Sequence, residues 1–449
     1  MKKIILMTGL LTLLLTSCDV LNTSSGSLYQ IYTDDLDYTN DSLKANGPYT
    51  SKAMPSAGDV NVLVVPVNFN SSKKKNGYLE AINNAFNGET NSYSVSEYYK
   101  KSSYGKLNLS FDVLDWYTPK NTASYYSSYE DDYDDGSTVL YREILDYLDS
   151  SIDFKDYDSD NDGYIDALWM VYNYDTYQTS DFWWAFSFLN QTNDEWDGVK
   201  AANYAFAGVD FLGDYLSYNS GLEKVDAKTF IHETGHLMGL DDYYSYNDSY
   251  SPLYGMDMMD QNVGDHSSIS KILLGWVTPT VITATTKSID LEPFTEKGKV
   301  LLISDHKVTT IYDEYILIDF YNGLGLDEYD NIYRYGLTRT IGIRVYHVDA
   351  TINTNEKNEI IYNGGDYSSP FKYDNTDSDN KFVRLLRQDT EKTNSYSGVS
   401  GDYLYRLTGK SFGKDIYKNY ILHSGKALAF SMTVNSLTDT LANVSIDFK

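Results

Sequence analysis

Residues 232–242 of this chain read His-Glu-Thr-Gly-His-Leu-Met-Gly-Leu-Asp-Asp, the pattern H-E-x-x-H-x-x-G-x-x-D. Residues four positions apart share one face of a helix, so His232 and His236 direct two imidazoles to one point. Glu233 lies beside them. A zinc hydrolase needs two nitrogen ligands, a general base next to the metal and an open coordination position. The spacing therefore predicts a zinc site.

The flanking residues predict that a helix carries this motif and then turns. Asp226 is expected to cap the helix, and no proline occurs from Ala227 to Met238. Gly239 accepts a left-handed backbone, so we expect the helix to end there and Asp242 to return as a third, oxygen ligand. Two of only six histidines fall in this register. This favours zinc over the alternative of an exposed polar helix surface.

The composition is that of an acidic globular protein. The chain has 449 residues, enough for two or three domains with sizeable cores. It carries 64 acidic and 36 basic residues, a formal net charge of −28. That charge argues against nucleic acid as a partner, since nucleic-acid binding requires a basic surface. It fits an extracellular protein that binds cations.

The N-terminus has the features of a targeting signal. Two lysines precede an apolar run from Ile4 to Leu15. Residues 15–18, Leu-Thr-Ser-Cys, resemble the lipobox of bacterial lipoproteins, and Cys18 is the only cysteine in the chain. We expect a signal peptide over 1–17, a tether over 18–55 and an extracellular protein anchored to the bacterial cell membrane by lipid on Cys18. The alternative is an ordinary signal peptide with an incidental cysteine.

Strand and helix signals alternate before the motif. The apolar runs Val62–Val67 and Ala167–Tyr172 are typical of buried strands. Helices are expected around residues 79–86 and 140–148 and after the capping box at Ser94.

After about residue 280 the pattern becomes an alternation of polar and apolar residues, which is typical of strands. The clearest segments are 314–320, 341–348 and 444–448. We therefore expect an α+β chain, with a catalytic domain of mixed sheet plus helices over 56–280 and a β-rich, sandwich-like domain over 281–449.

An aspartate-rich stretch predicts a second metal site. Asp158, Asp160 and Asp162 occupy positions 1, 3 and 5 of a calcium loop, with glycine at position 6. Tyr164 would contribute its carbonyl, and Asp166 would act at position 9. Position 12 is tryptophan instead of glutamate, so the last ligand must come from elsewhere. We expect a stabilising calcium ion; the alternative is a solvated acidic turn.

Three methionines after the motif suggest a methionine turn beneath the metal, as in metzincins. Met259 is the first choice for it and Met258 the second. His266 is a rival third ligand, a hydrogen-bond donor to the transition state or a structural residue. The histidines of the C-terminal half lack metal-ligand spacing, and structural roles are expected for them. They are His306, His347 and His423.

The ordered combination of these motifs resembles the immune inhibitor A family of secreted bacterial zinc metallopeptidases. Besides the zinc motif and the aspartate-rich loop, the resemblance depends on four stretches. They are 94–107, 257–260, 271–277 and 346–349. The resemblance implies a metzincin-like, zincin-type catalytic domain with zinc bound by His232, His236 and Asp242. It also implies Glu233 as catalytic acid/base and calcium at the acidic loop.

These features predict a cell-surface zinc endopeptidase that hydrolyses peptide bonds in proteins through a metal-activated water. Glu233 would take the proton from that water and deliver it to the leaving amine. The expected partners are a polypeptide substrate along an edge strand and the membrane, through Cys18. The rival is a surface adhesin or glycan-binding lipoprotein on an inactive protease scaffold. A third reading is a metallohydrolase that acts on non-peptide substrates.

Overall fold

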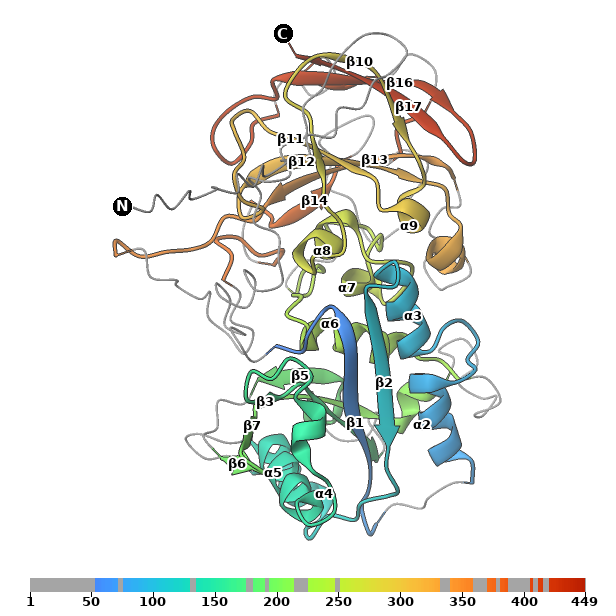
Figure 1. Cartoon of the computed structure of the whole chain (residues 1–449), viewed down its shortest axis with the longest axis vertical. Coiled ribbons are helices and arrows are strands. Elements are labelled where there is room, and N and C mark those ends of the chain that lie inside the picture. The colour runs from blue at the N-terminus through green and yellow to red at the C-terminus, as the bar shows by residue number, and fades with distance from the viewer. Residues whose placement is uncertain are drawn as a thin grey trace, which may run out of the picture.

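The computed structural model describes residues 53–71, 76–129, 135–174, 181–189, 194–213, 225–246, 251–331, 340–357, 370–376, 380–386, 404–406, 411–414 and 420–448 (Figure 1). The expected signal peptide over 1–17, Cys18 and most of the tether over 18–55 lie outside these residues. None of the helices described here is both long enough and apolar enough to cross a membrane.

A five-stranded mixed sheet forms the first half of the described chain, in the order β2-β1-β4-β8-β5. The central strands run parallel, and the edge strand β5 is antiparallel to β8. Their bounds are β1 (Gly58–Asn68), β2 (Leu107–Val113), β4 (Leu168–Asn173), β5 (Phe186–Leu189) and β8 (Asn203–Gly208). The two predicted buried strands are confirmed as β1 and β4.

Helices cover both faces of this sheet. Successive residues of β1 point to opposite faces, and both faces carry buried apolar side chains. One face packs against α2 (Tyr78–Asn87), α3 (Val95–Ser102) and α6 (Lys228–Leu237), and the other against α4 (Ala123–Ser127) and α5 (Gly136–Leu148). The predicted helices around 79–86 and 140–148 are confirmed. The hydroxyl of Ser94 accepts a hydrogen bond from the Glu97 amide at 3.3 Å, as the capping box predicts.

Shorter elements connect the sheet to α6 and to the second half. A small sheet, in the order β3-β7-β6, follows the aspartate-rich loop. Its strands are β3 (Tyr164–Ile165), β6 (Glu195–Trp196) and β7 (Val199–Ala201). The 3₁₀ helices are η2 (Phe154–Tyr157), η4 (Asp181–Trp183), η5 (Val209–Leu212) and η8 (Gly325–Asn331). The short α-helices after α6 are α7 (Met258–Gln261), α8 (Ser268–Leu273) and α9 (Phe294–Lys297).

The second half contains two larger sheets, drawn in the upper part of Figure 1. One has the order β14-β13-β12-β11-β9, with β9 (Thr280–Val281), β11 (Val300–Ile303), β12 (Glu314–Tyr321), β13 (Gly342–Asp349) and β14 (Val383–Leu385). The other has the order β10-β17-β16-β15, with β10 (Thr286–Leu291), β15 (Ser411–Gly413), β16 (Phe430–Leu437) and β17 (Ala442–Phe448). The predicted strand segments are thus confirmed, and the described chain is α+β.

Strands β12 and β13 are buried on both faces, although an alternating pattern is more typical of a strand with one exposed face. Ile316 and Ile318 belong to the apolar cluster shared with the other C-terminal sheet. Tyr315 and Leu317 belong to the cluster that also contains α6. The cluster around α6 therefore continues past residue 280, where we predicted a domain boundary, and that boundary stays a prediction.

Candidate metal centre

Helix α6 presents the motif residues to one point, as the spacing predicts. The helix begins at Lys228, and its N-cap residue is Ala227 instead of the predicted Asp226. Asp226 still helps to fix the helix start, because its Oδ1 accepts a hydrogen bond from the Lys228 amide at 3.0 Å and its Oδ2 lies 2.9 Å from Lys228 Nζ. The predicted N-cap residue, Asp226, therefore lies one position before the observed one.

Gly239 turns the chain directly after α6. Its φ is 95°, a left-handed conformation that glycine adopts at low cost, and its amide donates to the His236 carbonyl at 2.8 Å. The turn brings Asp242 back over the helix, as predicted.

The side chains of His232, His236 and Asp242 converge. Asp242 Oδ1 lies 2.9 Å from His232 Nε2 and 3.3 Å from His236 Nε2. Ligand atoms about 2.0–2.1 Å from a tetrahedral zinc ion lie roughly 3.3 Å apart. All three side chains are buried, so the group has both the spacing and the shelter that a zinc site requires.

The outer ring nitrogens are fixed by backbone carbonyls. His232 Nδ1 donates to the Met258 carbonyl at 2.9 Å, and His236 Nδ1 donates to the Leu240 carbonyl at 2.7 Å. A proton on Nδ1 leaves the Nε2 lone pair of each ring directed at the convergence point.

Two tyrosines hold the carboxylate of Asp242 in place. Asp242 Oδ2 accepts hydrogen bonds from the hydroxyl of Tyr244 at 3.0 Å and from the hydroxyl of Tyr246. These bonds leave Oδ1 of Asp242 directed at the two histidines.

The electrostatics of the group favour a positive charge at its centre. Burial works against a charged imidazole, but Asp242 and Glu233 outweigh it and raise the pKa of His236 to about 10. Burial alone would also raise the pKa of Asp242, yet His236 and His232 hold it well below its usual range. A metal cation would satisfy the same attraction without a proton.

Glu233 is buried on α6 next to this group. Burial raises the pKa of its carboxyl above the usual range, and the two histidines only partly oppose that shift. A carboxylate whose pKa is shifted towards neutrality can both accept and return a proton, which is what a general acid/base requires.

Met259 lies beneath the zinc motif, where we predicted a methionine turn. A β-carbon built on Gly235 would lie only 2.5 Å from Met259 Sδ. Asp257 caps α7 by accepting a hydrogen bond from the Met259 amide at 2.7 Å. The same turn supplies the Met258 carbonyl that orients His232.

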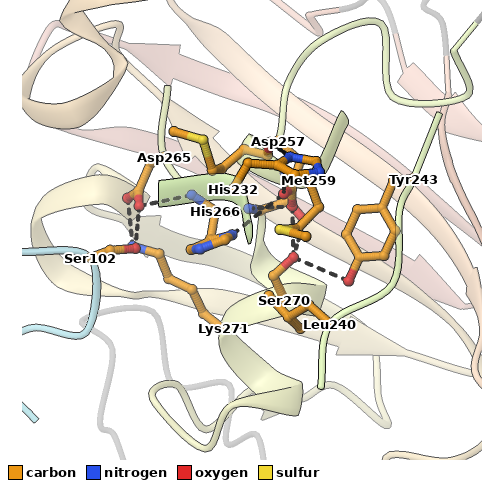
Figure 2. Close-up of polar contacts among 12 residues, drawn as sticks. Ser102, His232, Leu240, Tyr243, Asp257, Met259, Asp265, His266, Ser270 and Lys271 are labelled. Carbon is orange, nitrogen blue, oxygen red and sulfur yellow. Dashed lines mark hydrogen bonds and ion pairs between the residues drawn. The ribbon is translucent and has the colours of Figure 1, made fainter. Parts of the chain in front are cut away.

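His266 lies in a buried network next to this turn, not in the three-residue group (Figure 2). Its ring is fully buried and packs against Tyr98, Tyr99 and Trp276, with centroid separations of 5.7, 5.8 and 5.9 Å. Its Nδ1 lies 3.5 Å from Asp257 Oδ1. His266 is therefore not one of the three converging ligands, and the predicted catalytic role and its structural alternative both stay open.

The network in Figure 2 anchors α8 beneath the site. Ser270 Oγ donates to Asp257 Oδ2 at 2.7 Å and lies 3.2 Å from the hydroxyl of Tyr243, whose proton it can accept. Lys271 Nζ lies 2.5 Å from Asp265 Oδ2, and both side chains are buried. This bonding ties α8 to the methionine turn.

The aspartate-rich loop brings three of its predicted ligands together. The carboxylates of Asp158, Asp160 and Asp166 offer oxygen atoms that lie within 4.8 Å of one another. Burial raises the pKa of Asp166 to about 7, and a calcium ion would relieve that cost. Asp162 is not in this group of carboxylates and accepts a hydrogen bond from the Tyr164 amide at 2.9 Å, and the predicted Tyr164 carbonyl ligand stays a prediction.

Glu314, His347 and His423 form a further candidate group, although the two histidines lack metal-ligand spacing in the sequence. It is the one cluster of the described residues that sequence reasoning missed.

No model of a known protein family matches the chain, and no curated protein matches it either.

Proposed function

We propose that this protein is a zinc-dependent endopeptidase that hydrolyses peptide bonds in proteins. The observation that carries the proposal is the convergence of His232 Nε2, His236 Nε2 and Asp242 Oδ1, with Glu233 on the same helix. Two imidazoles and one carboxylate suit zinc, whereas calcium prefers oxygen ligands alone. Three protein ligands leave a coordination position open for water, as in catalytic zinc sites.

Each residue has a defined part in the proposed reaction. A zinc ion bound there would polarise the scissile carbonyl and acidify a water molecule. Glu233 would accept a proton from the attacking water and return it to the leaving amine. Asp242, oriented by Tyr244 and Tyr246, completes the ligand set.

The proposed substrate is an extended polypeptide. Strand β5 is an edge strand of the first sheet among the described residues, and it contacts α6. An extended peptide that pairs with such an edge is held by main-chain hydrogen bonds, which require no particular side chains.

The same proposal covers the finer architecture and the location. The first half would be a zincin-type, metzincin-like domain related to the immune inhibitor A family. The second half would be sandwich-like, which the apolar cluster shared by its two large sheets supports. Calcium would stabilise the aspartate-rich loop, and lipid on Cys18 would anchor the protein outside the cell.

The proposal is tested by zinc content and by cleavage. Purified protein is analysed for zinc by mass spectrometry and incubated with casein before and after chelation and after zinc is restored. We expect zinc, cleavage, loss of cleavage on chelation and recovery with zinc. A zinc-loaded protein that cleaves nothing in a broad peptide library would instead support the adhesin or glycan-binding alternative.

A further inference from the structure

Three side chains that could hold a metal, two of them buried, gather beside the apolar cluster between the two C-terminal sheets. Glu314 begins β12, His347 belongs to β13, and His423 precedes β16. Glu314 pairs with Asp349 across the two strands, and Ile316 pairs with His347. Because side chains alternate along a strand, Glu314, His347 and Asp349 lie on the same face as Ile316, which belongs to the apolar cluster between the sheets.

We propose that Glu314, His347 and His423 form a second zinc site, which links β12 and β13 to the segment before β16. His347 Nε2 lies 2.8 Å from Glu314 Oε1, and the rings of His347 and His423 have centroids 4.7 Å apart. One ligand atom from each of the three residues lies within 4.8 Å of the others. Zinc would widen the 2.8 Å contact towards roughly 3.3 Å, the separation of ligands around a tetrahedral ion.

Both histidines are oriented in the way that zinc ligands usually are. His423 Nδ1 donates to Asp349 Oδ2 at 2.8 Å. In the metal-free protein His347 Nε2 donates to Glu314 Oε1, and its Nδ1 accepts from the hydroxyl of Tyr420 at 2.6 Å. Metal-binding imidazoles typically donate their second nitrogen to such an outer partner, which fixes the ring and its tautomer. Zinc would displace the proton that His347 Nε2 shares with Glu314, the ring would then donate from Nδ1 to the Tyr420 oxygen, and Nε2 of each ring would bind the metal.

The carboxylate is also fixed before any metal binds. Glu314 Oε2 accepts a hydrogen bond from the Ser424 amide at 2.9 Å, and Oε1 accepts one from the His423 amide. These two bonds hold the segment that carries His423 against the start of β12. The ligand set is therefore preorganised, which reduces the entropy that binding must overcome.

The ligand types favour zinc, and the position of the site between distant segments indicates that the zinc ion stabilises the fold. Two imidazoles disfavour calcium and magnesium. The side chain of His423 is 11% exposed, so water can reach the group and supply a fourth ligand. The ligands come from segments far apart in sequence and do not form a site in the unfolded chain, so bound zinc stabilises the native state alone.

The experiment counts zinc in the full chain and in single variants, with excess calcium present to fill the aspartate-rich loop. After dialysis against zinc and removal of unbound metal, we expect two equivalents in the wild type and one in His423→Ala. His306→Ala is the matched control and should keep both, because His306 lies in the same half but pairs with Asp305 and Asp313. Equal zinc content in the wild type and His423→Ala would overturn the proposal.

A variant of the other centre keeps the test decisive if His423→Ala does not fold. His236→Ala leaves the second half intact, so it should retain one equivalent of zinc. Zinc should raise its melting temperature, and this shift should be absent from His236→Ala/His423→Ala. A His236→Ala protein without zinc would contradict the second site. Because peptide hydrolysis is not measured, failure of the proposed peptidase activity would leave this result unaffected.

Discussion

Met259 Sδ lies directly against the backbone of Gly235, so that a β-carbon on that glycine would be 2.5 Å from the sulfur and 3.3 Å from the hydroxyl of Tyr99. The methionine turn and the helix of the zinc motif are therefore in contact at a position where any side chain larger than that of glycine would have to displace Met259. The same turn supplies the carbonyl that orients His232. Packing beneath the helix and the direction of His232, a proposed zinc ligand, thus depend on neighbouring residues of one turn, Met259 and Met258.

This contact predicts that Gly235→Ala destabilises the protein. Extra volume in a packed core costs about 1–3 kcal/mol, and we expect urea denaturation to show a loss of that order. Met259→Ala removes the obstructing sulfur, so the added cost of Gly235→Ala should be smaller in that background. Equal costs in both backgrounds would mean that the two residues are not coupled.

The tyrosines on Asp242 predict an effect on zinc affinity. Tyr244→Phe and Tyr246→Phe each remove a hydrogen bond to Asp242 Oδ2. Loss of an outer partner of a ligand weakens metal binding by about 10- to 100-fold. Competition with a chromogenic chelator measures the change, and Tyr147→Phe, at an exposed tyrosine of α5, is the control. The assigned role of these tyrosines is wrong if both variants bind zinc as tightly as that control.

Asp260 predicts a pH dependence of stability. Burial raises the pKa of its carboxyl from the usual 3.8 to about 6 in the folded protein. Between these values the folded state binds more protons than the unfolded state, so this group's contribution falls as pH rises from about 4 to about 6. Asp260→Asn stays neutral, and its melting temperature relative to the wild type should rise across that window. Parallel curves for the two proteins would contradict the prediction.

The aspartate-rich loop predicts a stabilising effect of calcium. Addition of calcium to the chelated protein should raise its melting temperature, because the ion neutralises the grouped carboxylates of Asp158, Asp160 and Asp166. Asp166→Asn should lose most of this rise. Asp149→Asn, at an exposed position after α5, should keep it. A rise of the same size in Asp166→Asn would place the calcium elsewhere.

Local signals in the sequence predicted much of this structure. The apolar runs became β1 and β4, the capping box at Ser94 begins α3, and Gly239 turns the chain after the zinc motif. Each of these features depends on residues that are close together in the sequence. Local sterics and hydrogen bonding decide them before any distant contact forms.

Features that depend on strand register could not be predicted in this way. His347 and His423 lie 33 and 109 positions after Glu314, and only the pairing of β12 with β13 and the return of the segment before β16 bring them together. His266 shows the converse. Its short distance in sequence from the methionine turn suggested a place at the metal, but it lies outside the three-residue group and packs against three aromatic rings.

The most direct test of the account is the zinc content and peptide hydrolysis of Glu233→Gln, measured on the same preparation. The substitution keeps the shape of the side chain and removes the base, while His232, His236 and Asp242 still bind the metal. We expect wild-type zinc content and a fall in hydrolysis of about 10²- to 10⁴-fold, the contribution of a general acid/base. Zinc retention with wild-type hydrolysis would contradict the account.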